Sequence, residues 1–460
     1  MKQQSAQQSK GVEVMQSIQN LDQFFELKRP KAFSNRVVLV CGLMAAIEAM
    51  DVYVLGVIIS PMAKHFDVSL AYFAIVFTFQ AVGQIIGTYV IAPLADSHGR
   101  RPVILFCTVA FGILTLTSAL SPTLPIFIAQ RAIAFIFIGG AIPNIFAIAS
   151  EYAAGQARHR NSLIIGSFHG IGAGMAALAG GFLLSYGWQA PLIACGILTL
   201  LSAVLAYIYV PESLRFLAAS ADRSDALKSV VRRIDPSLNQ VRLDLAPPPA
   251  TAPKMRVAEL FTPELRRATL LLWVIGAITL SLLSSIAQWL PTFIHTYGMV
   301  DLKQAAYMTS LNGPAGVLWP LALIWLMRRL GISRGMTLNY TLAAIAFSCF
   351  ALLPLYANIG WVLAIGLGAF LGGATSGFYA LCNMVYPTRV RATGTSFAVG
   401  TGRVFSLFVP VLGGIAVSSN ISVTVVASAI VVPLLIAAAA AYLIGRNADA
   451  APDEMPTGQR

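Results

Sequence analysis

Long apolar runs follow one another along most of this chain, separated by short polar breaks or breaks rich in glycine and proline. Each run holds about 20 residues, enough for an α-helix to cross a hydrocarbon core about 30 Å thick. Lipid offers backbone amides no water, so such runs must form helices there. The pattern predicts twelve helices, near residues 36–61, 70–95, 102–121, 124–150, 162–186, 189–210, 268–293, 305–327, 336–356, 359–385, 394–418 and 421–445.

Composition agrees with a protein that lies in a membrane. Of the 460 residues, 57% are hydrophobic and 11% are charged, whereas soluble domains contain about 25% charged residues. The net charge of +12 does not indicate a nucleic-acid partner, because the lysines and arginines gather in alternate loops. Positive loops remain on the cytoplasmic side. We therefore expect the bacterial inner membrane, a lipid bilayer as partner and both termini in the cytoplasm.

Polar segments divide the chain into two halves. The predicted organisation is a cytoplasmic tail (1–35), a six-helix bundle (36–210), a central cytoplasmic loop (211–267), a second six-helix bundle (268–445) and a short cytoplasmic tail (446–460). The fold class is therefore an all-α polytopic membrane protein with twelve transmembrane helices. Two related bundles around a central cavity are expected of an alternating-access transporter.

A shift of about 232 residues relates the two halves. It places a basic glycine turn of the first half, Gly99 to Arg101, on Gly331 to Ser333 of the second half. Arg328, Arg329 and Arg334 flank the second turn. The match predicts two bundles that repeat one architecture.

The loop after the second predicted helix reads APLADSHGRR from Ala92. It resembles the major facilitator superfamily signature G-x-L-x-D-R-x-G-R-R, with Ala92 and Ser97 as departures. An acid at one helix end and arginines at a glycine turn can form charge-assisted bonds between neighbouring helix ends. The predicted cytoplasmic gate comprises Asp96, Gly99, Arg100, Arg101, Glu151, Arg158, Arg160, Arg389 and Arg391.

Further stretches resemble the aromatic acid:proton symporter family. They are GGAIPN at 139–144, SEY at 150–152, PESLRFL at 211–217, QWLPT at 288–292 and YPTRVRATG at 386–394. The resemblance implies the major facilitator fold and proton-coupled import of a small aromatic organic acid. It implies no cofactor, and we expect a monomer.

Two acids lie near the middle of the first predicted helix. Glu48 and Asp51 are three residues apart, hence on one helix face. A carboxylate at that depth must face water, pair with a cation or take up a proton. These acids are the predicted proton-coupling site; a fixed structural pair with a buried arginine or amide is the alternative. The family pattern D-G-x-D becomes Glu48-Ala-Met-Asp51 here.

Two arginines lie inside predicted helices, away from the helix ends. Arg403 is the deeper, and its planar fork could bind a substrate carboxylate through two parallel hydrogen bonds. An internal ion pair is its alternative role, and for Arg131 a structural role is favoured. His169 could bond a substrate hydroxyl or act as a neutral helix contact. The predicted substrate-binding residues are Arg403, Arg131, Trp289, Tyr379, Gln288, Asn144 and His169.

Other function classes fit less well. The chain has no nucleophile elbow, P-loop, dinucleotide fingerprint or paired-histidine metal motif, so we expect neither an enzyme nor a metal site. Antiporters of the superfamily carry a proline where Met175 stands, which favours symport over export. Transport of another organic ion or a sugar-like solute, export, and a non-transporting receptor stay open as alternatives.

Overall fold

The computed structural model describes residues 31–152, 156–218, 224–234, 257–298, 300–352, 357–387, 390–419 and 421–449. All regular secondary structure in these ranges is helical. This confirms the all-α polytopic fold class. The first 30 residues, parts of the central loop, Arg389 and the last 11 residues lie outside the described ranges.

Eight helices of the first half pack on one another. The long helix α3 contacts α9 and α10, while α8 contacts α5 and α7. Their bounds are α3 (Lys31–His65), α4 (Leu70–Phe73), α5 (Ile75–Val90), α6 (Leu94–His98), α7 (Arg100–Ser118), α8 (Leu124–Glu151), α9 (Gln156–Leu183) and α10 (Gln189–Tyr209).

Between the halves lie the short helices α11 (Leu214–Ala218) and α12 (Ser224–Ile234). The apolar side of α12, with Leu227 and Val230, belongs to the same buried cluster as Leu214 and Leu217. Hydrophobic burial therefore attaches this part of the central loop to the first half.

The second half repeats this design. Its helix α13 contacts α17, α18 and α20, and α16 contacts α20 and α17. The bounds are α13 (Pro263–Gly298), α14 (Leu302–Ser310), α15 (Asn312–Leu330), α16 (Ile332–Leu352), α17 (Ala357–Val385), α18 (Arg391–Phe405), α19 (Val409–Ser418) and α20 (Val423–Asp449).

Eleven stretches of the described chain are long and apolar enough to cross a membrane. They correspond to eleven of the twelve predicted helices. The remaining prediction, 336–356, falls on α16, which ends at Leu352. Residues 353–356 lie outside the described chain.

The two related glycine turns have the same backbone conformation. Gly99 has φ 97° and ψ 152° at the start of α7, and Gly331 has φ 86° and ψ 156° before α16. Residues other than glycine rarely adopt such a positive φ. We call the end of the molecule that carries these turns the basic face, and the end at which α3 finishes the opposite face.

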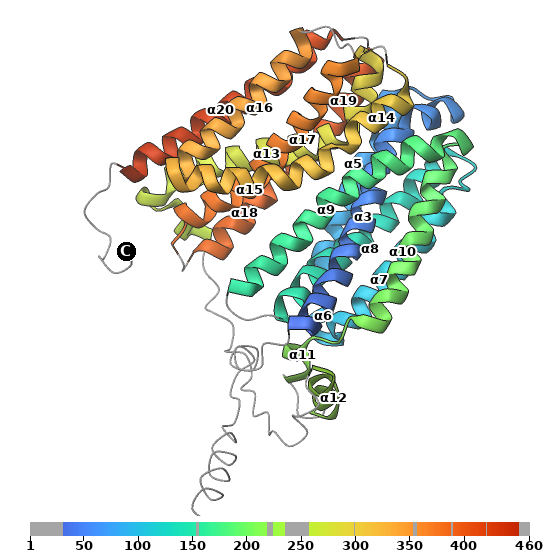
Figure 1. Ribbon diagram of the computed structural model, residues 1–460, viewed down its shortest axis with the longest axis vertical. Coiled ribbons are helices and arrows are strands. Elements are labelled where there is room, and N and C mark those ends of the chain that lie inside the picture. The colour runs from blue at the N-terminus through green and yellow to red at the C-terminus, as the bar shows by residue number, and fades with distance from the viewer. Residues whose placement is uncertain are drawn as a thin grey trace, which may run out of the picture.

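The two halves touch toward the opposite face. There α3 meets α13, α9 meets α14 and α15, and α19 meets α4 and α5. In Figure 1 the bundles approach one another near α5, α14 and α19 and diverge toward α9 and α18. Figure 1 also places α11 and α12 below the first bundle, beyond α6. One contact between the halves toward the opposite face involves a backbone atom, because the Thr292 hydroxyl donates to the Gly56 carbonyl at 3.3 Å.

Candidate functional site

The predicted acid Asp51 is paired with the predicted cation Arg131. Arg131 reaches from α8 to α3, and its two terminal nitrogens donate to the two carboxylate oxygens at 2.5 and 3.2 Å. Both side chains are 0% exposed. In this conformation Arg131 therefore forms an internal ion pair and is not a free cation for a substrate.

Other groups surround the guanidinium of Arg131. The Thr115 hydroxyl on α7 accepts a hydrogen bond from it at 3.3 Å. Gln80 on α5, with its amide oxygen turned to the guanidinium, accepts from Nε at 3.0 Å. Phe135 places its ring 5.2 Å from the guanidinium carbon. Four helices thus hold this pair, and its remaining donors are largely satisfied, as a buried ion pair requires.

Sequence reasoning missed Gln80 and Thr115. The available signal was an amide in an apolar stretch, because Gln80, like Gln84, stands in IVFTFQAVGQ. A buried amide or hydroxyl inside an apolar helix needs a partner. The partner of Gln80 lies on another helix, so the residues around Gln80 do not show which side chain it bonds.

Glu48 has a different environment from Asp51. It is 1% exposed, and neither carboxylate oxygen has a hydrogen-bond partner within the described part of the chain. Cys41 and Cys107 lie close enough to interact with it electrostatically. Both acids therefore lie inside the first bundle, and only Asp51 is compensated by a cation among the described residues.

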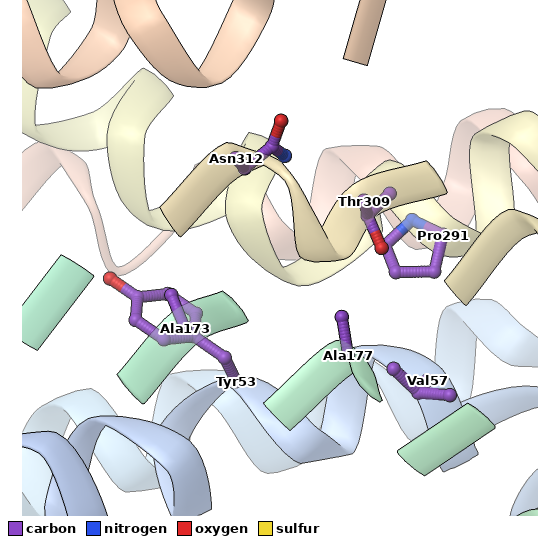
Figure 2. Close-up of a pocket in the computed structure, with 7 residues that line it drawn as sticks. All are labelled: Tyr53, Val57, Ala173, Ala177, Pro291, Thr309 and Asn312. Atoms are coloured by element: carbon purple, nitrogen blue, oxygen red, sulfur yellow. The ribbon is translucent and has the colours of Figure 1, made fainter. Parts of the chain in front are cut away.

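A small cavity lies where the two halves meet. Its volume is about 40 Å³, well below the roughly 150 Å³ of a cavity that holds a benzene ring. Figure 2 shows Tyr53, Val57, Ala173 and Ala177 on one side and Pro291, Thr309 and Asn312 on the other. This space is too small for an aromatic ring, so the halves are closed at this level.

His169 lies on α9 beside this cavity. Its ring centroid is 5.9 Å from that of Tyr53, and its imidazole is hydrogen-bonded to the backbone of Ala45. The bond to Ala45 joins α9 to α3. In this conformation His169 therefore contacts a neighbouring helix, which is one of the two roles expected for it.

Arg403 is exposed on α18. No acid of the described residues pairs with it, whereas Arg131 is fully compensated. Tyr379 on the neighbouring α17 is 42% exposed and lies close enough for an electrostatic interaction with Arg403. Next to Arg403, Gly402 packs closely on the backbone of Gly276 in α13. These contacts leave the guanidinium of Arg403 available to an anion.

The remaining predicted binding residues lie at helix contacts. Trp289 is buried, with its ring 5.9 Å from Phe77 of the first half. Gln288 beside it is also buried, and its side-chain oxygen has no partner among the described groups. Asn144 donates to the carbonyls of Ala92 and Gly140, at 3.2 and 2.9 Å. Its amide nitrogen therefore links α8 to the end of α5.

Three residues of the predicted gate, Arg100, Arg101 and Glu151, bond to other groups of the first half. Arg100 pairs with Glu151, whose second oxygen accepts from the Ser213 hydroxyl at 2.5 Å. Arg101 donates to the carbonyl of Tyr207 at 2.6 Å. Asp96 is exposed and forms no ion pair with another described residue. The side chains of Arg158, Arg160 and Arg391, like Arg389, lie outside the described residues.

Glu212 is the central acid that gate reasoning missed. Its carboxylate accepts from the backbone N–H groups of Arg100 and Arg101 at 2.9 and 3.2 Å. It thereby caps α7, where the helix dipole favours an anion. A Cβ on Gly99 would lie 2.4 Å from this carboxylate, so the glycine permits the cap. The acid is visible in the PESLRFL stretch, but that stretch does not indicate which helix end Glu212 caps.

Known proteins resemble this chain over most of its length. Residues 41–409 match the family profile described as the Major Facilitator Superfamily. The 4-hydroxybenzoate transporter of Pseudomonas aeruginosa is 29% identical, over 89% of this chain and 92% of that protein. A gallate transporter of Pseudomonas putida is 27% identical, over 89% and 91%.

A solved structure shares the fold. It is a bacterial homolog of the human lysosomal transporter Spinster, in an inward-facing and occupied conformation. It matches with a TM-score of 0.69 at 16% identity, over 91% of this chain and 98% of that one.

Proposed function

Because the chain belongs to the major facilitator superfamily, an integral membrane transporter family, we propose that it is a proton-coupled symporter of a small aromatic carboxylate. The substrate class is supported by the relatives, which are named for 4-hydroxybenzoate and gallate. The proposed location is the bacterial inner membrane, with both termini in the cytoplasm. The basic face then faces the cytoplasm, in agreement with the retention of positive loops.

The observation that carries the proposal is the buried pair of acids on α3. Asp51 is held by Arg131, and Glu48 beside it has no partner in the described chain. Protonation of Asp51 would leave Arg131 without its counter-charge and weaken the bond between α3 and α8. A proton can in this way change the packing of the first bundle, which is the requirement for coupling.

Alternating access agrees with the contacts between the halves. These contacts lie toward the opposite face, which corresponds to a conformation open to the cytoplasm. Substrate release on that side needs no further movement of these contacts. The return step must separate α9 from α14 and α15 and bring the basic-face ends together.

The proposed site for the substrate carboxylate includes Arg403. A carboxylate that enters the membrane needs a cation, and Arg131 is already paired. Arg403 is exposed without an acid partner in the described chain, and Tyr379 lies beside it. The fork of Arg403 can bind both carboxylate oxygens, and the Tyr379 ring offers a surface on which an aromatic ring can pack.

Reconstituted vesicles test this proposal. Inward-directed proton gradients should drive accumulation of labelled 4-hydroxybenzoate above its external concentration, and a protonophore should abolish the accumulation. The amide of the same compound, which has no charge, should not accumulate. Binding without accumulation would indicate a receptor, and proton efflux coupled to substrate entry would indicate an exchanger.

A further inference from the structure

The two glycine turns differ in how their charges are compensated. In the first half, Glu212 accepts from the first two backbone N–H groups of α7, and Glu151 pairs with Arg100. The turn at Gly331 has the same backbone conformation, yet a Cβ placed on Gly331 would find no atom within 4 Å. Among the described residues, nothing in the second half fills the place that Glu212 occupies in the first half.

No acid of the described residues replaces Glu212 there. The helix α10 ends at Tyr209, and the extended segment after it brings Glu212 over the turn. In contrast, α20 remains helical to Asp449 and places Gly445 against Ser333. The N–H groups of Ile332 and Ser333, at the start of the 21-residue helix α16, consequently have no acceptor in the described chain.

A buried hydroxyl is a further polar group at this turn, beside the two N–H groups, that has no partner in the described chain. Ser333 is 6% exposed, and its Oγ has no hydrogen-bond partner among the described residues. Buried hydroxyls are normally bonded. The hydroxyl, the first-turn N–H groups and the positive end of the helix dipole all favour an anion at this place.

Two arginines flank the turn at the end of α15. Arg328 and Arg329 are exposed, and neither forms an ion pair with a described residue. The Arg329 guanidinium lies over the ring of Trp325, 4.2 Å from its centroid, and Trp325 is 56% exposed. Tryptophan concentrates at the membrane–water interface, so these arginines lie at the level of the lipid headgroups.

We propose that the turn at Gly331 binds the phosphate of an anionic phospholipid headgroup. The phosphate occupies the place that the Glu212 carboxylate occupies in the first half. Its oxygens accept from the N–H groups of Ile332 and Ser333 and from the Ser333 hydroxyl, and Arg328 and Arg329 supply the charge. The source is a lipid because Trp325 and the helix ends place the turn at the membrane surface. This inference does not depend on the transported substrate.

Thermal unfolding of the full-length protein in a neutral detergent tests the proposal. The midpoint is titrated with phosphatidylglycerol, and an apparent affinity follows from the stabilisation. Phosphatidylcholine and inorganic phosphate are titrated in parallel. Phosphatidylglycerol should raise the midpoint well above the other two. An equal effect of inorganic phosphate would assign the turn to a free anion and overturn the lipid.

The variants use a matched pair of arginines. Arg328→Gln with Arg329→Gln should lower the affinity for phosphatidylglycerol about tenfold or more, because charge-assisted bonds are lost. Arg266→Gln with Arg267→Gln removes two adjacent exposed arginines near the start of α13, and should change the affinity less than about twofold. Equal losses in both pairs would overturn the site.

Ser333→Ala provides a second test without any change of charge. It should lower the affinity about threefold, the worth of one hydrogen bond. An undiminished affinity in both Ser333→Ala and the Arg328/Arg329 variant would overturn the proposal.

Discussion

Arg131 on α8 binds both carboxylate oxygens of Asp51 on α3, at 2.5 and 3.2 Å, with neither side chain exposed. The two residues are 80 positions apart in the sequence. Loss of one partner of a buried pair costs about 3–5 kcal/mol, because it leaves an uncompensated charge, whereas joint replacement costs less. Stability and proton coupling can therefore be separated at this pair.

Asp51→Asn should abolish uphill uptake and lower the free energy of unfolding by about 3 kcal/mol. Asp51→Asn combined with Arg131→Gln should recover much of that stability without recovering proton-driven uptake. Thermal unfolding and vesicle uptake measure the two effects, and substrate exchange should survive in both. Accumulation against a gradient by Asp51→Asn, with normal proton influx, would refute the coupling role.

Glu48→Gln should behave differently. Because no described group bonds the Glu48 carboxyl, the amide should change the free energy of unfolding by less than about 1 kcal/mol. Proton influx per substrate should still fall, though less than in Asp51→Asn. The ratio of proton to substrate fluxes in vesicles checks this, and an unchanged ratio would make Glu48 a purely structural residue.

Arg403→Lys should weaken binding of the aromatic acid about tenfold, because the charge stays but the planar fork is lost. Arg403→Ala should remove measurable binding. The neutral amide of the acid should bind weakly and be indifferent to both changes. Equilibrium binding to purified protein provides the measurement. A folded Arg403→Ala protein with full affinity would place the carboxylate elsewhere.

Glu212→Ala should lower the free energy of unfolding by about 2 kcal/mol, since two backbone donors at the start of α7 lose their acceptor. Asp96→Ala is the matched control, because Asp96 is exposed without an ion pair in the described chain, and should change it by less than about 0.5 kcal/mol. Thermal unfolding compares them. Equal effects would show that Glu212 does not stabilise this turn.

Gly56→Ala should disfavour the observed contact between the halves. Its Cβ would lie 2.0 Å from the backbone oxygen of Gln288, so α3 and α13 must move apart. A cysteine introduced at Ala177, which lines the interface cavity, should then react faster with a maleimide added from the opposite face. The control is Gly166→Ala, where a Cβ meets nothing within 4 Å. Equal labelling in the two proteins would contradict a steric role.

The sequence by itself determined the spans and the repeated turn. Each span depends only on the apolar character of consecutive residues. A helix forms its own backbone hydrogen bonds, and apolar side chains can face lipid without a specific partner. The turn at Gly331 was equally local, since the same residue at the same register adopts the same positive φ as Gly99. Such properties require no knowledge of a distant partner.

Only the tertiary structure decided which charges meet. The sequence placed Glu48 and Asp51 on one face, yet among the described residues only Asp51 has a partner, because the guanidinium of Arg131 reaches only one of them. The cap on α7 comes from Glu212, more than 100 residues away. No described acid takes its place at α16, where α20 continues as a helix. Which charged side chains meet depends on how the helices pack against one another. The pattern of residues along one helix does not specify that packing.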